Sequence, residues 1–360
     1  MIRIELLPAA FGDCILVEYG KTGAEARRIL VDAGVRATYA SCLLPRLTEL
    51  NGGRPVALEL LVVTHIDRDH IGGVLPLLQD APRMVTPKDT WFNGRHHLDL
   101  DALGAKDGEA LGAFLHKQGF PWNRAFSSDA TRAVVVPEAG PLPRIELGGG
   151  AAITLLSPYA RNLEELATRW DDTLGSWDTE PDDEEAMLRN DDLLGKRPAL
   201  TSLTVAEIRQ FSEATPQEDD TAPNGSSIAF LFEYDGKRVL LGADARPSVL
   251  LRSLERFSDN VVELDAFKMS HHGSMNNISA ALLAKIKCSR FLVSTSGASF
   301  GHPHPEAIAR VVCNGRDTKE ICFNYATEYT TVWDDPTTTA ALSYRALYPK
   351  PGEAGFVLEL

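Results

Sequence analysis

The chain has 360 residues, of which 44% are hydrophobic and 24% are charged, and its formal net charge is −14. This composition supports a large buried core and excludes a chain that is disordered throughout. No apolar stretch reaches the length that crosses a membrane, and the first residues resemble a strand rather than a signal peptide. The five cysteines are scattered and show no CxxC spacing, which is typical of buried thiols in a reducing compartment. We therefore expect a cytoplasmic protein with no membrane partner.

The negative charge is concentrated in one segment. Residues 161–220 contain 17 acidic and 6 basic residues, so the rest of the chain is close to neutral. Segments of this composition inside an enzyme are most often solvated insertions. We expect a single domain over residues 1–360 with an acidic insertion over 161–222. The insertion is either a mobile cap beside the active site or a plain surface insertion.

Apolar periodicity and turn residues predict alternating strands and helices along the chain. The predicted strands cover residues 2–7, 14–19, 28–31, 59–63, 91–94, 134–136, 153–156, 228–234, 237–241, 266–269, 291–294, 321–326, 330–333 and 356–360. The predicted helices cover residues 39–50, 109–117, 162–170, 202–211, 248–257, 279–287 and 306–312, and another begins at Val74. Residues 170–192 are expected to be irregular. Asp235-Gly236 suits the tight turn of a β-hairpin.

The stretch 64–73, THIDRDHIGG, lies between the strand 59–63 and the helix that begins at Val74. Polar side chains at such a strand end lie in the crevice where open α/β sheets bind ligands. His65 and Asp67 can reach one metal ion, while Asp69 and His70 are adjacent and can point toward a second. Imidazole and carboxylate ligands suit zinc, and a carboxylate-rich site also accepts manganese. The alternative, in which the acids cap a helix and the histidines are incidental, is less favoured.

This stretch resembles the metal-binding motif of the metallo-β-lactamase superfamily, in the HxDxDH form of ComEC-type competence proteins and their free-standing relatives. Most families have a histidine at the position of Asp67, so this departure favours the ComEC-like branch. The resemblance implies an α/β fold, a four-layer αββα sandwich, and two divalent metal ions, Zn²⁺ or Mn²⁺. It also implies that Asp32, in Asp32-Ala33-Gly34, supports the metal site from behind.

Three later motifs extend the resemblance. Gly242-Ala243-Asp244 matches the GD motif, so Asp244 would bridge both metal ions. Ser270-His271-His272-Gly273-Ser274 matches the SHHGS motif, in which one histidine is a ligand and the other can protonate the leaving group; the sequence leaves open which does which. In Gly301-His302-Pro303-His304, His302 would complete the second metal site and His304 would be peripheral.

Two other positions bear on the site. Asn224 stands where many superfamily members carry a further histidine ligand, so that ligand must come from elsewhere, and His271 or His272 can supply it. His96-His97 lies near the expected crevice and is expected to be a solvated loop pair rather than a substrate contact.

The resemblance implies a hydrolase. The candidate metal ligands are His65, Asp67, Asp69, His70, Asp244, His271, His272 and His302, and the candidate catalytic residues are Asp69, His271 and His272. Two ions would acidify a bridging water and stabilise the charge that develops during attack. The HxDxDH and SHHGS motifs indicate a phosphodiesterase or nuclease, with nucleic acid or a small phosphodiester as partner; protein partners are not indicated.

Two alternatives stay open. One is a lactonase-like or other acyl hydrolase on the same fold, because fold does not fix function. The other is a catalytically silent binding module. A basic groove beside the motifs would favour nucleic acid, and a closed apolar pocket would favour a small ester.

Overall fold

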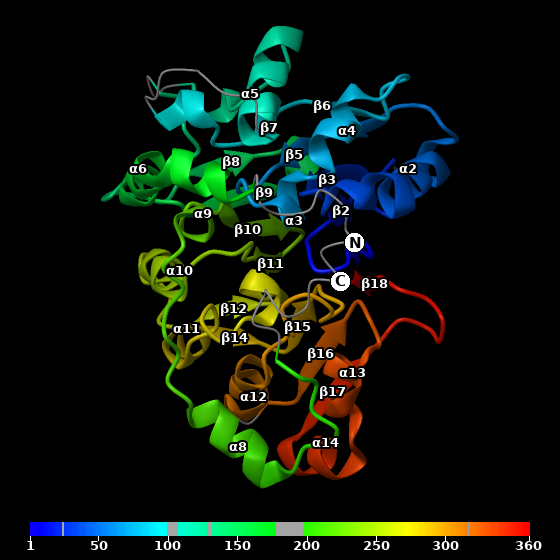
Figure 1. Ribbon diagram of the computed structural model, residues 1–360, viewed down its shortest axis with the longest axis vertical. Helices are drawn as coiled ribbons and strands as arrows, with labels where there is room; N and C mark the ends of the chain where they lie inside the picture. The colour runs from blue at the N-terminus through cyan, green and yellow to red at the C-terminus, as the bar shows by residue number, and fades with distance from the viewer. Residues whose placement is uncertain (24, 99–106, 128–130, 178–196, 316) are drawn as a thin grey trace.

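Two large β-sheets lie face to face in the middle of the molecule, and helices cover their outer faces (Figure 1). The computed structural model describes the whole chain apart from residues 24, 99–106, 128–130, 178–196 and 316. The first sheet has the strand order β18-β1-β2-β3-β5-β7, and the second has the order β17-β16-β15-β13-β11-β10-β9-β8. The predicted four-layer αββα sandwich is therefore confirmed.

The strands have the following bounds. The first sheet contains β1 (Ile2–Leu6), β2 (Ile15–Tyr19), β3 (Arg27–Val31), β5 (Leu60–Val62), β7 (Thr90–Trp91) and β18 (Phe356–Glu359). The second contains β8 (Arg144–Glu146), β9 (Ala152–Ser157), β10 (Ala229–Tyr234), β11 (Lys237–Leu241), β13 (Ala266–Lys268), β15 (Arg290–Val293), β16 (Lys319–Phe323) and β17 (Tyr344–Leu347). Two short parallel pairs are β4 (Val56–Leu58) with β6 (Val85–Pro87), and β12 (Val262–Leu264) with β14 (Ile286–Cys288).

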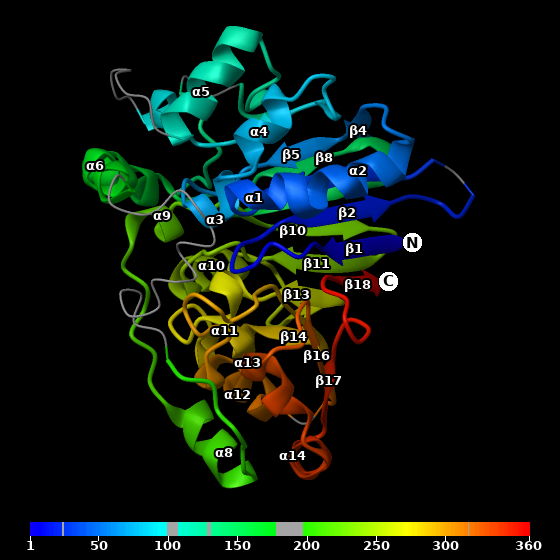
Figure 2. The same ribbon diagram turned by 45° about the vertical axis from the view of Figure 1, so that its right-hand side comes forward.

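Helices cover both outer faces (Figure 2). On the side of the first sheet lie α1 (Arg36–Thr38), a π-helical turn (Tyr39–Leu43), α2 (Leu44–Asn51), α3 (Arg68–Ile71), α4 (Val74–Gln79), α5 (Asp107–Gln118), α6 (Ala160–Trp177) and α9 (Ala222–Gly225). On the side of the second lie α8 (Val205–Glu213), α10 (Pro247–Leu254), α11 (Ala280–Lys285), α12 (Pro305–Cys313), α13 (Glu328–Thr331) and α14 (Pro336–Leu342).

Alternation along the strands separates the cores. In β5, Leu60 and Val62 face the second sheet, while Leu61 packs under the outer helices. In β11, Val239 and Leu241 face the first sheet, while Leu240 faces the opposite way. Because successive side chains of a strand point to opposite faces, one apolar run supplies two cores. These strands are apolar on both faces, as expected for sheets buried between layers.

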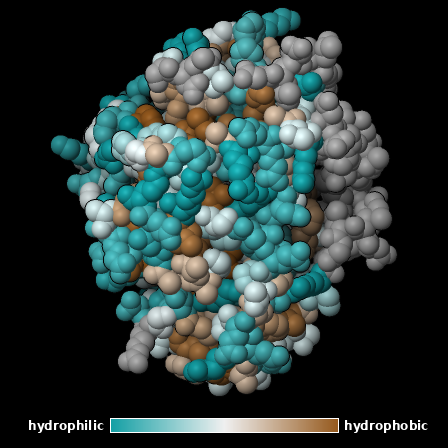
Figure 3. Space-filling model, turned by 90° about the vertical axis from the view of Figure 1, so that its left-hand side faces the viewer, coloured by the Kyte–Doolittle hydropathy of each residue, from teal (hydrophilic) through white to brown (hydrophobic). Residues whose placement is uncertain are grey.

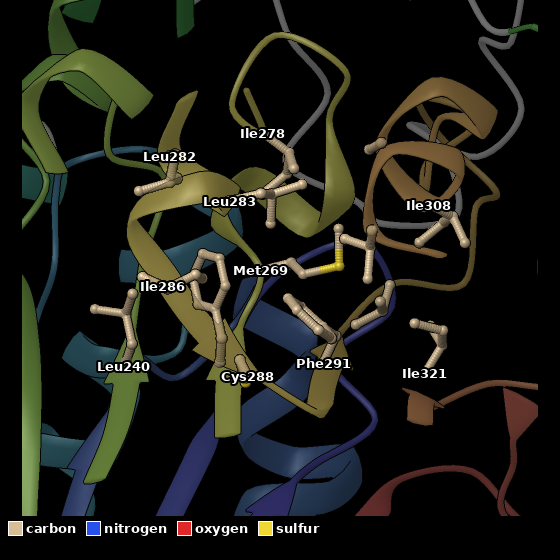
Figure 4. Packing of buried hydrophobic residues seen from close by; sticks show 14 of the residues in the cluster. Leu240, Met269, Ile278, Leu282, Leu283, Ile286, Cys288, Phe291, Ile308 and Ile321 are labelled. Atoms are coloured by element: carbon tan, nitrogen blue, oxygen red, sulfur yellow. The ribbon is translucent and has the colours of Figure 1, made fainter. Parts of the chain in front are cut away.

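The core beneath the second sheet joins its strands to α11 and α12 (Figure 4). Phe291 of β15 and Ile321 of β16 lie below Ile308 of α12, while Leu282 and Leu283 come from α11. The buried face of each helix is apolar, so packing against the sheet stabilises helices that are too short to be stable alone. This packing fixes the loops that enter each helix.

The parallel strands direct the candidate site residues to one edge. β3 runs parallel to β5, and β11, β13 and β15 run parallel to one another. The carboxyl ends of these strands lead into the loops that carry the predicted motifs. Figure 2 shows α3 and α9 at this end of the strands. The site therefore lies at one end of the sandwich, between the two sheets.

Several local predictions were wrong. Residues 330–333 form helical turns instead of a strand, because Thr327 and Thr330 make a reciprocal capping box that begins α13. Residues 134–136 form only an isolated bridge at Val136, because the backbone of Val134 bonds instead to the side chain of Asn93. Strand β7 ends at Trp91, since the Asn123 side chain takes the backbone partners of Phe92.

The acidic segment is partly helical. Helix α6 continues to Trp177, so residues 170–177 are not irregular as predicted; residues 178–192 lie outside the described part of the chain. Leu166 and Trp170 of α6 are buried in the core between the first sheet and its outer helices, and α8 packs on α12. The surface on the side of the molecule that carries α6 is mostly hydrophilic (Figure 3). Among the described residues, no helix combines the length and apolarity needed to cross a membrane.

Candidate metal centre

The Asp244 carboxylate lies in the middle of the candidate residues. Its Oδ2 atom lies within 4 Å of the Nε2 atoms of four histidines: His70 at 3.3 Å, His271 at 3.8 Å, His272 at 3.8 Å and His65 at 3.9 Å. These histidines come from the loops after β5 and β13, and Asp244 comes from the loop after β11. The structure thus brings together residues that are up to about 200 positions apart in the sequence.

The two acids of the 64–73 stretch, Asp67 and Asp69, also lie beside these histidines. The Oδ2 atom of Asp69 is 3.2 Å from His272 Nε2 and 3.6 Å from His70 Nε2. The Oδ2 atom of Asp67 is 3.5 Å from His65 Nε2. One group of donors is therefore His65, His70 and Asp244, and a second is Asp69, His70 and His272.

Hydrogen bonds behind His65 and His70 fix which ring nitrogen carries the proton. His70 Nδ1 donates to Asp32 Oδ2 at 2.8 Å. The Thr64 hydroxyl also donates to Asp32 Oδ2, so its oxygen accepts a hydrogen bond from His65 Nδ1 at 2.9 Å. Asp32 is fully buried, in agreement with the supporting role that the resemblance implies for it. In the neutral rings, both Nε2 atoms therefore carry a lone pair that faces Asp244.

Hydrogen bonds at Nδ1 also assign the proton in His271 and His272, the histidine pair after β13. His272 Nδ1 donates to the carbonyl oxygen of Ser294 at 2.9 Å. His271 Nδ1 lies 3.1 Å from Asp219 Oδ2 and 3.0 Å from Asn277 Oδ1, which are both acceptors. Their Nε2 atoms therefore also present lone pairs to the centre.

The centre consists of acceptors that lack a donor. Within the part of the chain that the structure describes, Nε2 of His65, His70 and His272 and Oδ1 of Asp244 are buried without a hydrogen-bond partner. Buried polar atoms are otherwise nearly always paired. Imidazole nitrogens and carboxylate oxygens around a common centre suit a divalent cation such as zinc or manganese. The residues present therefore fit the divalent metal ions that the sequence resemblance implies.

The pKa values of these histidines and of Asp244 also show that the centre favours positive charge. Burial lowers the pKa of His272, but the carboxylates of Asp244 and Asp13 raise it more, to about 9. Burial also lowers the pKa of His70, which Asp244, Asp69 and Asp32 together raise well above its ordinary value. Burial raises the pKa of Asp244, and the surrounding histidines lower it well below its usual range. The carboxylates that would attract a cation therefore also favour protonation of these histidines when no metal is bound.

His302 lies at the margin of the centre. Its ring centroid is 5.2 Å from that of His271, and no ion pair with Asp244 is formed. Burial, followed by the charges of His304, His271 and His272, lowers the pKa of His302 well below its ordinary value. His304 is engaged elsewhere, since its Nδ1 accepts from the backbone of Met275 at 3.0 Å. The structure thus brings His302 beside the centre but not into the two donor groups.

A buried ion pair supports the centre from between the sheets. Lys268, at the end of β13, is fully buried and donates to Asp13, which follows Gly12 in the first sheet's opening loop. Asp13 Oδ1 is also 3.5 Å from His272 Nδ1. Gly12 has no room for a side chain, because a Cβ there would lie 1.8 Å from the carbonyl oxygen of Asp69. The two sheets are therefore tied together directly behind Asp69 and His272.

The backbone around the histidine pair is strained. His271 and His272 have φ angles of 48° and 53°, and Ala243 next to Asp244 has a φ of 44°. Non-glycine residues in this left-handed region persist where surrounding structure fixes them, and they cluster at functional sites. The strain is concentrated in the loops that carry the donors.

Sequence patterns did not identify Asp219, Asn277 or Lys268 as parts of the site. Each is a single polar residue outside any motif, and its role arises from contacts with distant segments. The prediction for His96-His97 was wrong for His97, which is buried and packs edge-on against Trp122 at 4.4 Å between ring centroids. Burial, followed by the charge of His96, lowers the pKa of His97 to about 4.

Residues 7–150 match the model of the Metallo-beta-lactamase superfamily. This region, which is less than half of the chain, is therefore similar to that superfamily. The matched region includes the HxDxDH stretch and ends before Asp244. The placement of the later motifs in this centre therefore rests on the geometry described above.

Solved structures are similar to the chain at low sequence identity. A mutant of the CmlA beta-hydroxylase is 13% identical, covers 99% of this chain and 54% of its own, and has a TM-score of 0.39. Zn²⁺-bound PqqB from Methylobacterium extorquens is 13% identical over 100% of both chains, with a TM-score of 0.39. The metallo-beta-lactamase fold protein YhfI from Bacillus subtilis is 12% identical over 100% of this chain and 99% of its own, with a TM-score of 0.36. This chain spans about half of the CmlA chain. A comparison with curated proteins gives no match.

Proposed function

We propose that the protein is a metal-dependent hydrolase that cleaves phosphodiester bonds in nucleic acid or in a small diester. The observation that carries this proposal is the convergence of four imidazole Nε2 atoms on Asp244 Oδ2, at 3.3 to 3.9 Å. The choice of phosphodiesters over other esters is supported by the resemblance of the HxDxDH and SHHGS motifs to the ComEC-like branch.

The residues divide into two groups around Asp244. His65, Asp67 and His70 would hold one Zn²⁺ or Mn²⁺ ion, and Asp69 and His272 would hold the second, with Asp244 between the two. We assign His271 to the ligands as well, because it lies beside Asn224, 3.4 Å from that amide, where the resemblance expects a further ligand. His302 is the remaining candidate for the second ion.

When bound, the two ions would supply Lewis acidity, which brings the pKa of a water toward neutrality and offsets charge on the phosphoryl oxygens. The protein's own residues hold the donors rigidly. Asp32, Ser294 and Asp219 each accept a hydrogen bond from the far ring nitrogen of a histidine, so little reorganisation is needed during the reaction. His271, with 26% of its side chain exposed, is the most exposed of the four histidines around Asp244 and is open to an entering substrate.

A substrate panel tests the proposal. Chelated protein, with manganese or zinc added back, is assayed on bis(p-nitrophenyl) phosphate, single-stranded DNA, double-stranded DNA and p-nitrophenyl acetate. We expect metal-dependent cleavage of the phosphodiesters. Cleavage of the acetate alone would instead support an acyl hydrolase, and no cleavage of any substrate would contradict the proposal.

A further inference from the structure

Asp219 connects the acidic segment to the metal centre. It lies just before α9, outside every motif, yet its Oδ2 atom is 3.1 Å from His271 Nδ1. Its side chain is only 6% exposed, although its neighbour Asp220 is exposed. A surface acid of an ordinary insertion would be solvated, so this burial requires partners.

Both carboxylate oxygens of Asp219 are held. Oδ2 accepts from Asn224 Nδ2 at 2.6 Å and from Asn277 Nδ2 at 3.2 Å, in addition to His271. Oδ1 accepts from the backbone amide and hydroxyl of Thr221, at 3.0 and 2.8 Å. Oδ1 therefore fixes the local turn, while Oδ2 faces the metal centre.

We infer that Asp219 is a positioning residue, which holds His271 with its Nε2 atom toward Asp244 and so makes the acidic segment part of the metal centre. The inference rests on the proposed metal centre. Two acceptors, Asp219 Oδ2 and Asn277 Oδ1, lie closest to His271 Nδ1, and the Asn224 amide 3.4 Å away already donates to Asp219 at 2.6 Å, so we assign the proton to Nδ1. The lone pair is then on Nε2, 3.8 Å from Asp244 Oδ2.

His271 needs such an anchor more than the other histidines do. The side chains of His65, His70 and His272 are at most 1% exposed and are packed on all sides, whereas that of His271 is 26% exposed. Asn277 would hold His271 less firmly without Asp219, because one of the two hydrogen bonds that orient the Asn277 amide goes to Asp219 and only the other, to the Asp244 carbonyl oxygen at 3.1 Å, would remain. Without Asp219, we expect His271 to turn and its amide partners to rearrange.

Substitution of Asp219 by asparagine tests the inference at constant size. An amide can present an acceptor either to His271 or to the Thr221 amide, but its NH₂ group then faces donors on the other side. Asp220→Asn is the matched control, since it removes the same charge one residue away. Thr221→Val is the second control, because it removes a hydrogen bond to Oδ1 without touching the contact with His271.

Zinc affinity of the zinc-loaded full chain, measured by competition with a chromophoric chelator, is the main measurement. We expect Asp219→Asn to weaken one zinc ion about 10- to 100-fold, as for other partners of metal-bound histidines, and both controls to bind as wild type does. Histidine ring ¹⁵N spectra should show one imidazole leaving the Nδ1–H tautomer only in Asp219→Asn.

Three outcomes would overturn the inference. Wild-type zinc affinity of Asp219→Asn would show that the contact does not position His271. An equal loss of zinc affinity in Thr221→Val would show that Asp219 only stabilises the local turn. Lost hydrolysis with unchanged zinc affinity would exclude positioning of a ligand. A wild-type protein that binds zinc but cleaves no phosphodiester would contradict the proposed function alone, while the affinity comparison still supports the inference.

Discussion

Four imidazole Nε2 atoms lie within 4 Å of Asp244 Oδ2, and three of them, with Asp244 Oδ1, are buried without a hydrogen-bond partner among the described residues, so Asp244 is the most sensitive residue of the centre. A carboxylate in this position can contact cations on both of its sides, and an amide cannot replace its charge. The neighbouring histidines lower the pKa of Asp244 after burial has raised it, so the group is ionised at any ordinary pH. Removal of this negative charge should therefore weaken metal binding and hydrolysis.

We expect Asp244→Asn to lower phosphodiester hydrolysis by more than about 100-fold, because loss of a direct contact should exceed the 10- to 100-fold typical of outer partners. The measurement is the rate on bis(p-nitrophenyl) phosphate at saturating manganese. Asp235→Asn is the matched control, since Asp235 is exposed in the β-hairpin turn and its φ of 51° suits asparagine. A rate of Asp244→Asn equal to that of the control would remove Asp244 from the centre.

The raised pKa values of His70 and His272 predict proton release when zinc binds. His272, with a pKa of about 9, is protonated in the metal-free protein near neutral pH, and zinc binds only the unprotonated ring. Zinc affinity should therefore rise with pH from 7 to 9 and level off above that range. Calorimetry in two buffers of different ionisation enthalpy measures the protons released. Identical heats in both buffers would contradict these pKa values.

At the scale of elements, the Asp13–Lys268 pair joins the opening loop of the first sheet to the end of β13 in the second. Lys268 is fully buried, and its ammonium also donates to the carbonyl oxygen of Met269 at 3.2 Å. Burial raises the pKa of Asp13, and the charges of Lys268 and His272 lower it below its usual range. Removing one partner leaves a buried charge that is not compensated.

We expect Lys268→Met to lower the free energy of unfolding by about 3–5 kcal/mol, the usual cost of breaking a buried pair. Lys237→Met is the control, because Lys237 forms a half-exposed pair with Asp265 that should contribute about 1 kcal/mol or less. Denaturant unfolding of both variants measures the difference. If Asp13→Asn combined with Lys268→Met is no more stable than Lys268→Met alone, the unpaired carboxylate is not the cause.

Elements with a strong local signal were predicted well, and those that depend on distant partners were not. The hairpin of β10 and β11 follows from Asp235-Gly236 between two apolar runs. The run Thr330-Thr331-Val332 has the β-branched residues of a strand, but the capping box with Thr327 makes it helical. Similarly, Asn93 and Asn123 end β7 through bonds made across the fold.

For the molecule as a whole, the four layers and the convergence of the motif residues were predictable because the motifs stand at the ends of apolar strands. The supporting residues were not, since Asp219 and Lys268 carry no local pattern and acquire their partners only when the two sheets meet. The net charge of −14 also gave little guidance, because much of it lies in the acidic segment. Arg246 ties that segment to the core through Glu165 at 2.9 and 3.1 Å and through the carbonyl oxygen of Thr221 at 2.8 Å.

The most direct test is the number of metal ions that each chain binds. Chelated protein is dialysed against a small excess of zinc, and bound metal is then measured by elemental analysis beside the protein concentration. The geometry around Asp244 predicts two tightly bound ions per chain. A chain that retains no zinc under these conditions would contradict the metal centre and the hydrolase that depends on it.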